Sequence, residues 1–262
     1  MQRRSFLGAV ATAAMGAPFT AIAQVTDLND AINKAGRQRM LSQRMGKAWL
    51  ALLMDVEPAS ARQILDRSIS LFDRQLVELR TYAPAPDIRE TYGTLDQAWN
   101  DYKVALVGVA PAKAGAPAVL RADAKVLALA NQGTQQYEAV SGRSVGKLVN
   151  IAGRQRMLSQ RMAKFYLAAS LPVDTAAANE EIRRSRAEFV KAMEILRNAP
   201  EATPRIKEEL QLADGQWVFF DAALNKIQSG ANAKSAQDVF VSSENLLSVM
   251  DRVTGLYSAI KV

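Results

Sequence analysis

The chain has 262 residues, of which 49% are hydrophobic, and a formal net charge of +7. This length and composition fit one large or two modest globular domains rather than a disordered chain. The sequence contains no Cys and no His, which excludes disulfides, thiol and imidazole catalysis and the commonest zinc ligands. No constellation of carboxylate, Lys, Tyr or Ser side chains indicates another active site, so we expect no enzyme, no metal site and no cofactor.

The first residues resemble an export signal of the twin-arginine (Tat) type. The segment Met1-Gln-Arg-Arg-Ser-Phe-Leu7 opens an apolar, alanine-rich stretch, and Ala21-Ile-Ala23 fits a small-residue cleavage site. We therefore expect residues 1–23 to be removed as a signal peptide by cleavage after Ala23, which gives a periplasmic mature chain. An ordinary Sec signal that begins with two arginines is the alternative, and it leads to the same compartment.

The mature chain has no stretch with the length and apolarity of a transmembrane helix, so we expect no membrane span in it. Loss of the two signal arginines lowers the formal charge from +7 to +5, a mild excess spread along the chain. Export argues against a nucleic-acid partner. The aromatic residues also lack the interleaved basic residues of a surface on which bases stack.

The first half of the mature chain predicts four helices with apolar residues at steps of three and four, the spacing of a bundle seam. The first helix is expected to begin at the N-cap Thr26 and to end at Met54. The second is expected at about residues 59–82 and the third at about 87–109. The fourth begins near Ala118.

The end of the fourth helix is ambiguous, because no proline occurs between Pro117 and Pro172. The helix either continues into the first helix of the second half or breaks within Ser141-Gly-Arg-Ser144. We favour a kink near Gly142, since glycine weakens a helix without forbidding it.

The second half repeats the plan of the first. Its first helix, which carries the second motif copy, is expected to run to Leu171, before the stop Pro172. The next is expected from the N-cap Asp174 to about Asn198 and the third from the turn at Pro204 to Ile227. The last has an apolar seam from Val239 to Ile260. Strand signals are absent. We therefore predict an all-α fold of two tandem antiparallel four-helix bundles related by an internal duplication, in domains 24–141 and 142–262.

An eleven-residue stretch of the first predicted helix occurs twice. Ala35-Gly-Arg-Gln-Arg-Met-Leu-Ser-Gln-Arg-Met45 recurs unchanged as Ala152 to Met162, at a spacing of 117 residues. At the same spacing, pairs such as Leu65 and Ile182 keep only hydrophobic character, as a shared fold requires. The motif keeps its polar residues as well, which suggests a role beyond packing.

Residues three, four and seven apart share a helix face, so Gly36, Arg39 and Gln43 form one line, and Arg37 and Arg44 belong to its neighbour. A guanidinium is a permanently charged planar fork that suits planar oxyanions, and glycine lets a ligand or a second helix approach the backbone. No acidic residue that would neutralise the arginines lies between Asp30 and Asp55 or between Glu138 and Asp174. The candidate ligand-binding residues are Gly36, Arg37, Arg39, Gln43, Arg44, Gly153, Arg154, Arg156, Gln160 and Arg161.

Two interpretations of the motif remain open. The basic residues can belong to solvated faces of ordinary surface helices, as most charge runs do. If the two motif helices instead face each other across a pseudo-twofold axis, paired arginines repel until a small anion lies between them. The unchanged polar positions favour the second interpretation.

The stretch from Asn33 to Met45 resembles the first-helix motif of the PilJ-type sensory domain of type IV pili chemotaxis transducers. A related domain forms the periplasmic sensor of nitrate/nitrite histidine kinases. The resemblance implies a four-helix bundle that pairs through its first helices. In the nitrate sensors, one central arginine from each partner binds the anion at the interface. The matching arginines here are Arg39 and Arg156, the family glycine matches Gly36 and Gly153, and the second family arginine matches Arg44 and Arg161.

Two departures from this family pattern matter. The chain has Arg37 and Arg154 where the nitrate sensors carry a small polar residue, which can alter the ligand. It also shows no kinase or methyl-accepting region, so we expect it to need a partner in order to signal.

We therefore predict an exported, chemotaxis-like sensor that binds a small oxyanion, nitrate or nitrite first, between the two motif helices. It would report to a membrane receptor, kinase or transporter. The site forms within a monomer or across a homodimer. The alternative is a helical adaptor that docks its basic faces on an acidic partner or envelope surface without a small ligand, which predicts salt-sensitive binding.

Overall fold

A computed structural model of the chain describes residues 24–171, 173–226 and 232–261. The predicted export signal, the stop at Pro172 and the helix end at Ile227 lie outside these residues. Within these ranges the chain forms eight α-helices and no strand, which confirms the all-α prediction. The helices are α1 (Leu28–Leu53), α2 (Pro58–Tyr82), α3 (Pro86–Val107), α4 (Ala116–Ser141), α5 (Ser144–Ser170), α6 (Thr175–Asn198), α7 (Pro204–Asn225) and α8 (Ala233–Ser258), with a 3-10 turn at Lys113–Gly115.

Helix starts follow local signals in the sequence. Asp27 caps α1 by accepting the backbone N–H of Asp30 at 2.9 Å, one residue after the predicted N-cap Thr26. Asp174 caps α6 as predicted. Proline lies in the first turn of α2, α3, α4 and α7, where its missing N–H breaks no intrahelical hydrogen bond. None of the helices in the described ranges is long and apolar enough to cross a membrane.

The chain reverses direction between α4 and α5. Gly142 adopts a left-handed conformation with φ of 60°, and its N–H donates to the Glu138 carbonyl, which closes α4 at Ser141. Glycine takes this conformation without the steric penalty that a Cβ would bring. The kink that we favoured at Gly142 is therefore wrong, and the helix breaks there. The turn coincides with the proposed boundary between domains 24–141 and 142–262, which itself stays a prediction.

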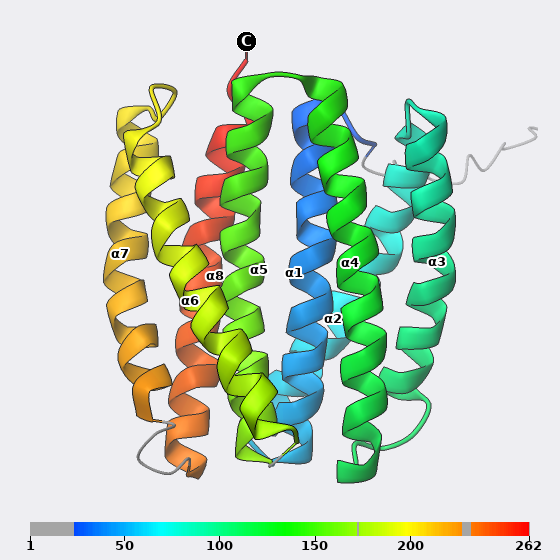
Figure 1. Cartoon of the computed structure of the whole chain (residues 1–262), viewed down its shortest axis with the longest axis vertical. Coiled ribbons are helices and arrows are strands. Elements are labelled where there is room, and N and C mark those ends of the chain that lie inside the picture. The colour runs from blue at the N-terminus through cyan, green and yellow to red at the C-terminus, as the bar shows by residue number, and fades with distance from the viewer. Residues whose placement is uncertain (1–23, 172, 227–231, 262) are drawn as a thin grey trace, which may run out of the picture.

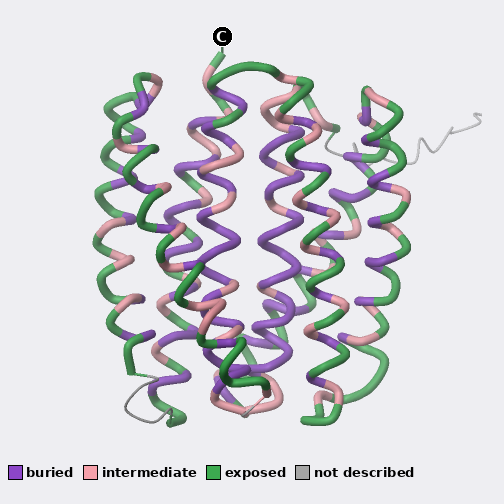
Figure 2. Tube along the Cα trace, viewed as in Figure 1, coloured by how far each residue is buried: buried purple, intermediate pink, exposed green. Residues whose placement is uncertain are grey.

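The two motif helices, α1 and α5, form the centre of the molecule (Figure 1). Helix α1 packs against α2 and α4, with α3 on α4, and helix α5 packs against α6 and α8, with α7 on α8. The central helices are parallel and in register, since Gly36 faces Gly153 and Gly46 lies beside Lys164. Figure 2 shows that buried positions concentrate on these two helices.

The two four-helix groups repeat the same side-chain contacts. The Tyr137 hydroxyl donates to the Leu79 carbonyl at 2.8 Å in the first group. In the second group the Tyr257 hydroxyl donates to the Leu196 carbonyl, also at 2.8 Å. Because equivalent helices make equivalent hydrogen bonds, the prediction of two tandem four-helix bundles related by duplication is confirmed.

The duplicated motif lies in the α1–α5 interface, where nine of its eleven residues are buried in each copy. This surface packs against its own copy, so a change in one copy disturbs the other, and packing alone favours identity. Two polar positions of the motif make hydrogen bonds outside this interface: Gln38 donates to the Phe72 carbonyl on α2 at 3.3 Å, and Ser42 donates to the Arg39 carbonyl within α1 at 2.9 Å. The serine bond is repeated in the second copy, where Ser159 donates to the Arg156 carbonyl, whereas Gln155 donates to the Ile151 carbonyl of its own helix.

Gly133→Ala should destabilise the fold by about 1–3 kcal/mol, because the added methyl group overpacks the contact between α3 and α4. A Cβ at Gly133 would lie 2.6 Å from Cε2 of Tyr92, a fully buried residue whose ring packs edge-on against Tyr137. Gly93→Ala is the matched control in α3, since nothing lies within 4 Å of its Cβ. That change should stabilise the helix by about 0.5–1 kcal/mol. Urea unfolding compares both variants, and a fully stable Gly133→Ala variant would contradict this close packing.

Candidate functional site

The centre of the α1–α5 interface contains two buried guanidinium groups. Arg39 on α1 is 1% exposed and Arg156 on α5 is 0% exposed. Gly36 and Gly153 leave space for them: the position of a Cβ on Gly36 lies 3.2 Å from Nη2 of Arg39 and 3.6 Å from Nη2 of Arg156. The structure thus brings four of the candidate residues together at one point.

Each central guanidinium is held by the partner helix. Nη2 of Arg39 donates to the carbonyl oxygen and to Oδ1 of Asn150, at 3.3 and 2.6 Å. Nη2 of Arg156 donates to the Asn33 carbonyl at 3.0 Å. The Nε atoms of both arginines are buried and have no hydrogen-bond partner among the described residues. Buried donors without acceptors cost free energy, and an acceptor placed beside these Nε atoms would lower that cost.

The two arginines differ in the residue that their Nη1 atoms contact. Nη1 of Arg39 donates to Oδ1 of Asn131 at 2.9 Å, whereas Nη1 of Arg156 donates to Oδ1 of Asp251 at 2.5 Å. Arg156 therefore has a carboxylate partner, and Arg39 has none within the described part of the chain. Burial, and then the charges of Arg154 and Arg156, lower the pKa of Arg39 to about 9. Burial likewise lowers the pKa of Arg156 to about 10.

The other candidate arginines are paired with carboxylates from neighbouring helices. The pairs are Arg37 with Asp251, Arg44 with Glu244, Arg154 with Glu188, and Arg161 with Glu181. These carboxylates lie on α6 and α8, so the lack of acidic residues near the motif in the sequence does not describe the charge around it in the fold. Our expectation that nothing neutralises the motif arginines is therefore wrong for these four.

A second buried polar layer lies about one turn further along α1 and α5, and the two candidate glutamines belong to it. Gln43 donates to Asp123 at 2.6 Å, and Gln160 donates to the Ser243 carbonyl at 3.0 Å. Asp123 is fully buried and also accepts from the ammonium group of Lys164. The structure therefore gives these glutamines a bridging role between helices and does not place their hydrogen bonds on the central arginines.

Acid should weaken the contact between α1 and α8 at Glu244. Burial would raise the pKa of this carboxyl, but the charges of Lys47 and Arg44 outweigh burial and lower the pKa to about 2. Lys47 Nζ lies 2.6 Å from Oε1 of Glu244. Burial lowers the pKa of Lys47 to about 8 despite this contact.

Because the folded pKa of Glu244 lies below its ordinary value of 4.5, its stabilisation is complete above about pH 4.5 and is lost as the pH falls towards 2. The loss should reach up to about 3 kcal/mol. Glu244→Gln should flatten the acid limb of the unfolding free energy measured between pH 5 and 2. Asp96→Asn, which removes the exposed partner of Arg80, is the control and should leave that limb unchanged. An unchanged acid limb in the Glu244 variant would contradict the assignment.

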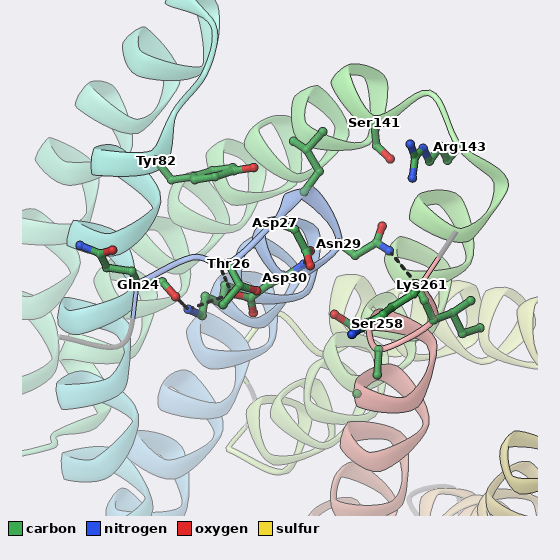
Figure 3. Close-up of a pocket in the computed structure, with 15 residues that line it drawn as sticks. Gln24, Thr26, Asp27, Asn29, Asp30, Tyr82, Ser141, Arg143, Ser258 and Lys261 are labelled. Carbon is green, nitrogen blue, oxygen red and sulfur yellow. Dashed lines mark hydrogen bonds and ion pairs between the residues drawn. The ribbon is translucent and has the colours of Figure 1, made fainter. Parts of the chain in front are cut away.

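A large cavity of about 1030 Å³ lies where α1 begins and α8 ends, away from the arginine pair (Figure 3). Its lining includes Asp27, Asn29, Tyr82 and Lys261 but neither central arginine. This cavity is therefore separate from the buried arginine pair. Among the described residues, no group of three or more acidic side chains is arranged to hold a metal ion.

A smaller groove of about 440 Å³ lies between α4, α5 and α6, beside the arginine pair. Asn131 and Arg154 line it, and Nη1 of Arg154 donates to Oδ1 of Asn131 at 3.2 Å. Since Asn131 also contacts Arg39, the groove connects the protein surface to the first hydrogen-bond partner of that arginine.

Sequence patterns did not reveal Asn131 and Asp251, because these residues lie 92 and 95 positions from the arginines that they contact. One signal points to them in retrospect. When Tyr137 is aligned with Tyr257, Asn131 and Asp251 fall on the same position of the two halves, and a carboxylate replaces an amide there.

Comparison with protein families identifies the relatives of this chain. The family model described as type IV pili methyl-accepting chemotaxis transducer N-term matches residues 21–140 and, a second time, residues 137–242. No curated protein and no solved structure matches the chain. The two matched segments together run from α1 into the first part of α8 and cover most of the sequence. The chain therefore belongs to the PilJ family of chemotaxis-transducer sensory domains and carries this domain twice in tandem.

Proposed function

We propose that this protein is a sensor that binds one small oxyanion, nitrate or nitrite, between Arg39 and Arg156. The observation that carries the proposal is the Arg39 guanidinium, which is buried beside Arg156 and contacts no carboxylate among the described residues. A sensory role without catalysis agrees with the family, whose domain belongs to chemotaxis transducers.

A small anion between the two guanidiniums would remove the main electrostatic cost of this arrangement. A buried cation without a counterion is unfavourable, and neighbouring cations repel more strongly in a low-dielectric interior than in water. The unpartnered Nε atoms of Arg39 and Arg156 would gain an acceptor if the side chains turned towards the anion. Nitrate and nitrite are small and planar, and their oxygens match the fork of donors on a guanidinium.

Burial of the site couples binding to movement. Because Arg39 and Arg156 are essentially inaccessible, an anion reaches them only if α1 and α5 or their neighbouring side chains shift. A ligand that binds the shifted arrangement more tightly raises its population. The proposed signal is therefore a change in the packing of α1 against α5, which moves one four-helix group relative to the other.

We propose that a membrane receptor, kinase or transporter reads this movement, and that the mature protein acts in the periplasm after loss of residues 1–23. The family supports the first point, because its domain is the N-terminal part of a chemotaxis transducer. The twin-arginine start and Ala21-Ile-Ala23 support the second. Two domains in one chain supply both arginines, so a monomer contains the complete site.

The adaptor alternative requires an exposed basic face on the motif helices. Arg39, Arg156, Lys47 and Lys164 are at most 2% exposed. The remaining motif arginines form ion pairs with carboxylates on α6 and α8. Such a surface leaves few free charges for an acidic partner, so the oxyanion proposal has the better support.

Calorimetric titration of the purified protein with nitrate, nitrite, chloride and sulfate at fixed ionic strength tests the proposal. Saturable binding of nitrate or nitrite, with close to one ion per chain, is the expected result. The absence of binding by any of these anions to folded protein would overturn the proposal and favour the adaptor.

A further inference from the structure

We infer that Asp251 and Asn131 together set the charge of the arginine site so that it accepts a monovalent oxyanion and rejects a divalent one. The inference rests on the proposed function, because it concerns which anion the central arginines take. It starts from a charged difference at a position that contacts a central arginine in both half-sites.

Asn131 and Asp251 occupy equivalent positions in α4 and α8. Each contacts Nη1 of one central arginine, Asn131 at 2.9 Å and Asp251 at 2.5 Å. Each also accepts from the flanking motif arginine on the same side, from Arg154 at 3.2 Å and from Arg37 at 3.0 Å. The duplication thus preserves the contacts of this position while its charge differs between the copies.

The charged groups that interact around the site leave one positive charge. Four guanidiniums face three carboxylates, and the residues are Arg37, Arg39, Arg154, Arg156, Glu138, Glu188 and Asp251. Glu138 acts indirectly: it accepts a hydrogen bond from Nδ2 of Asn150, and Oδ1 of Asn150 accepts one from Arg39. A monovalent anion neutralises this cluster. A divalent anion would leave an unpaired negative charge in a buried site, which is costly.

The groove reaches the site on the side of Arg39, which contacts no carboxylate among the described residues. Asn131 lines the groove between α4, α5 and α6, and behind it lies Arg39. An anion has to displace only the neutral amide of Asn131 there. On the opposite side it would have to displace the Asp251 carboxylate from two arginines. Asn131 therefore makes Arg39 the arginine that an incoming anion meets, whereas Nη1 of Arg156 stays bound to Asp251.

Three variants separate charge from packing. Asp251→Asn raises the charge of the cluster by one, and Asn131→Asp lowers it by one. The double variant Asn131→Asp with Asp251→Asn moves the carboxylate to the other half-site and restores the original charge. Asp96→Asn is the matched control for Asp251→Asn, because it changes the net charge of the protein equally at an exposed ion pair with Arg80.

The measurement is the affinity for sodium nitrate and for sodium sulfate at one ionic strength, with folding checked by circular dichroism. Asp251→Asn should raise the ratio of sulfate to nitrate affinity at least about tenfold, a change equivalent to about 1.4 kcal/mol. Asn131→Asp should weaken nitrate binding at least about tenfold, since a neutral cluster no longer attracts an anion. The double variant should show the wild-type ratio of sulfate to nitrate affinity. Asp96→Asn should leave this ratio unchanged.

The outcomes distinguish this inference from the proposed function. Wild-type protein that binds neither anion would overturn both. Wild-type protein that binds nitrate, together with a folded Asp251→Asn variant of unchanged selectivity, would overturn only the role of Asp251. If Asp251→Asn does not fold, Asn131→Asp still decides, because it adds a carboxylate to a cationic cluster and should fold. Unweakened nitrate binding in that variant would overturn the inference.

Discussion

Asp123→Ala should lower the free energy of unfolding by about 3–5 kcal/mol, because it removes one partner of a buried ion pair. The Asp123 carboxylate lies on α4, is fully buried, and accepts Gln43 Nε2 from α1 and the Lys164 ammonium from α5. Without it, a buried lysine lacks its counterion and a buried amide lacks its acceptor. Equilibrium unfolding in urea at pH 7 measures the loss.

The double variant Asp123→Ala with Lys164→Met separates the stranded charge from the lost volume. Replacing a buried ion pair by apolar side chains is often neutral or stabilising, so the double variant should recover most of the loss. A double variant as unstable as the single one would show instead that the cavity at position 123 dominates.

The pH dependence of the single variant provides an independent check. Burial already lowers the pKa of Lys164 below its ordinary value of 10.5. Without Asp123 the folded protein releases this proton more readily than the unfolded chain does. The penalty should therefore be larger at neutral pH and shrink as the pH rises towards 10.5. A loss that stays constant from pH 7 to 10 would rule out the stranded ammonium as its cause.

Helix positions were predictable because their signals are local. The second helix was expected at 59–82 and occupies Pro58–Tyr82, and Asp174 caps α6 as its sequence indicates. The prediction of a kink at Gly142 was wrong, because local propensity allows both a kinked helix and a turn. Packing decides between them, since α4 lies against α1 and the chain has to reverse before α5 can take its place beside α1.

The meeting of the two arginines was also accessible from the sequence, because an unchanged motif in two copies suggests a self-complementary interface. What the sequence could not supply is the charge around them. Glu244 and Asp251 come from α8, about 200 positions from the α1 residues Arg44 and Arg37 that they contact. Helix packing alone brings these carboxylates to the motif. Within the described part of the chain, Arg39 is then the one motif arginine without a carboxylate contact, and the other motif arginines form ion pairs.

Arg39→Met should weaken nitrate binding at least about 100-fold, because it removes the one central guanidinium that has no carboxylate partner. Arg39→Lys keeps the positive charge but loses the planar fork, so it should retain part of the affinity. Arg161→Met is the matched control in the same motif. Its guanidinium is paired with Glu181 on α6, and its loss should change the affinity no more than about threefold.

This comparison separates a specific site from general attraction by a basic protein. Each variant to methionine lowers the net charge by one, so diffuse attraction predicts similar modest losses from Arg39 and Arg161 and a strong dependence on ionic strength. A buried site predicts a large loss from Arg39 alone and little dependence on added sodium gluconate, a salt whose anion is too bulky to enter. Titration calorimetry of the three variants with nitrate measures both features. Equal losses from Arg39→Met and Arg161→Met would place the anion on the surface of the protein and not between α1 and α5.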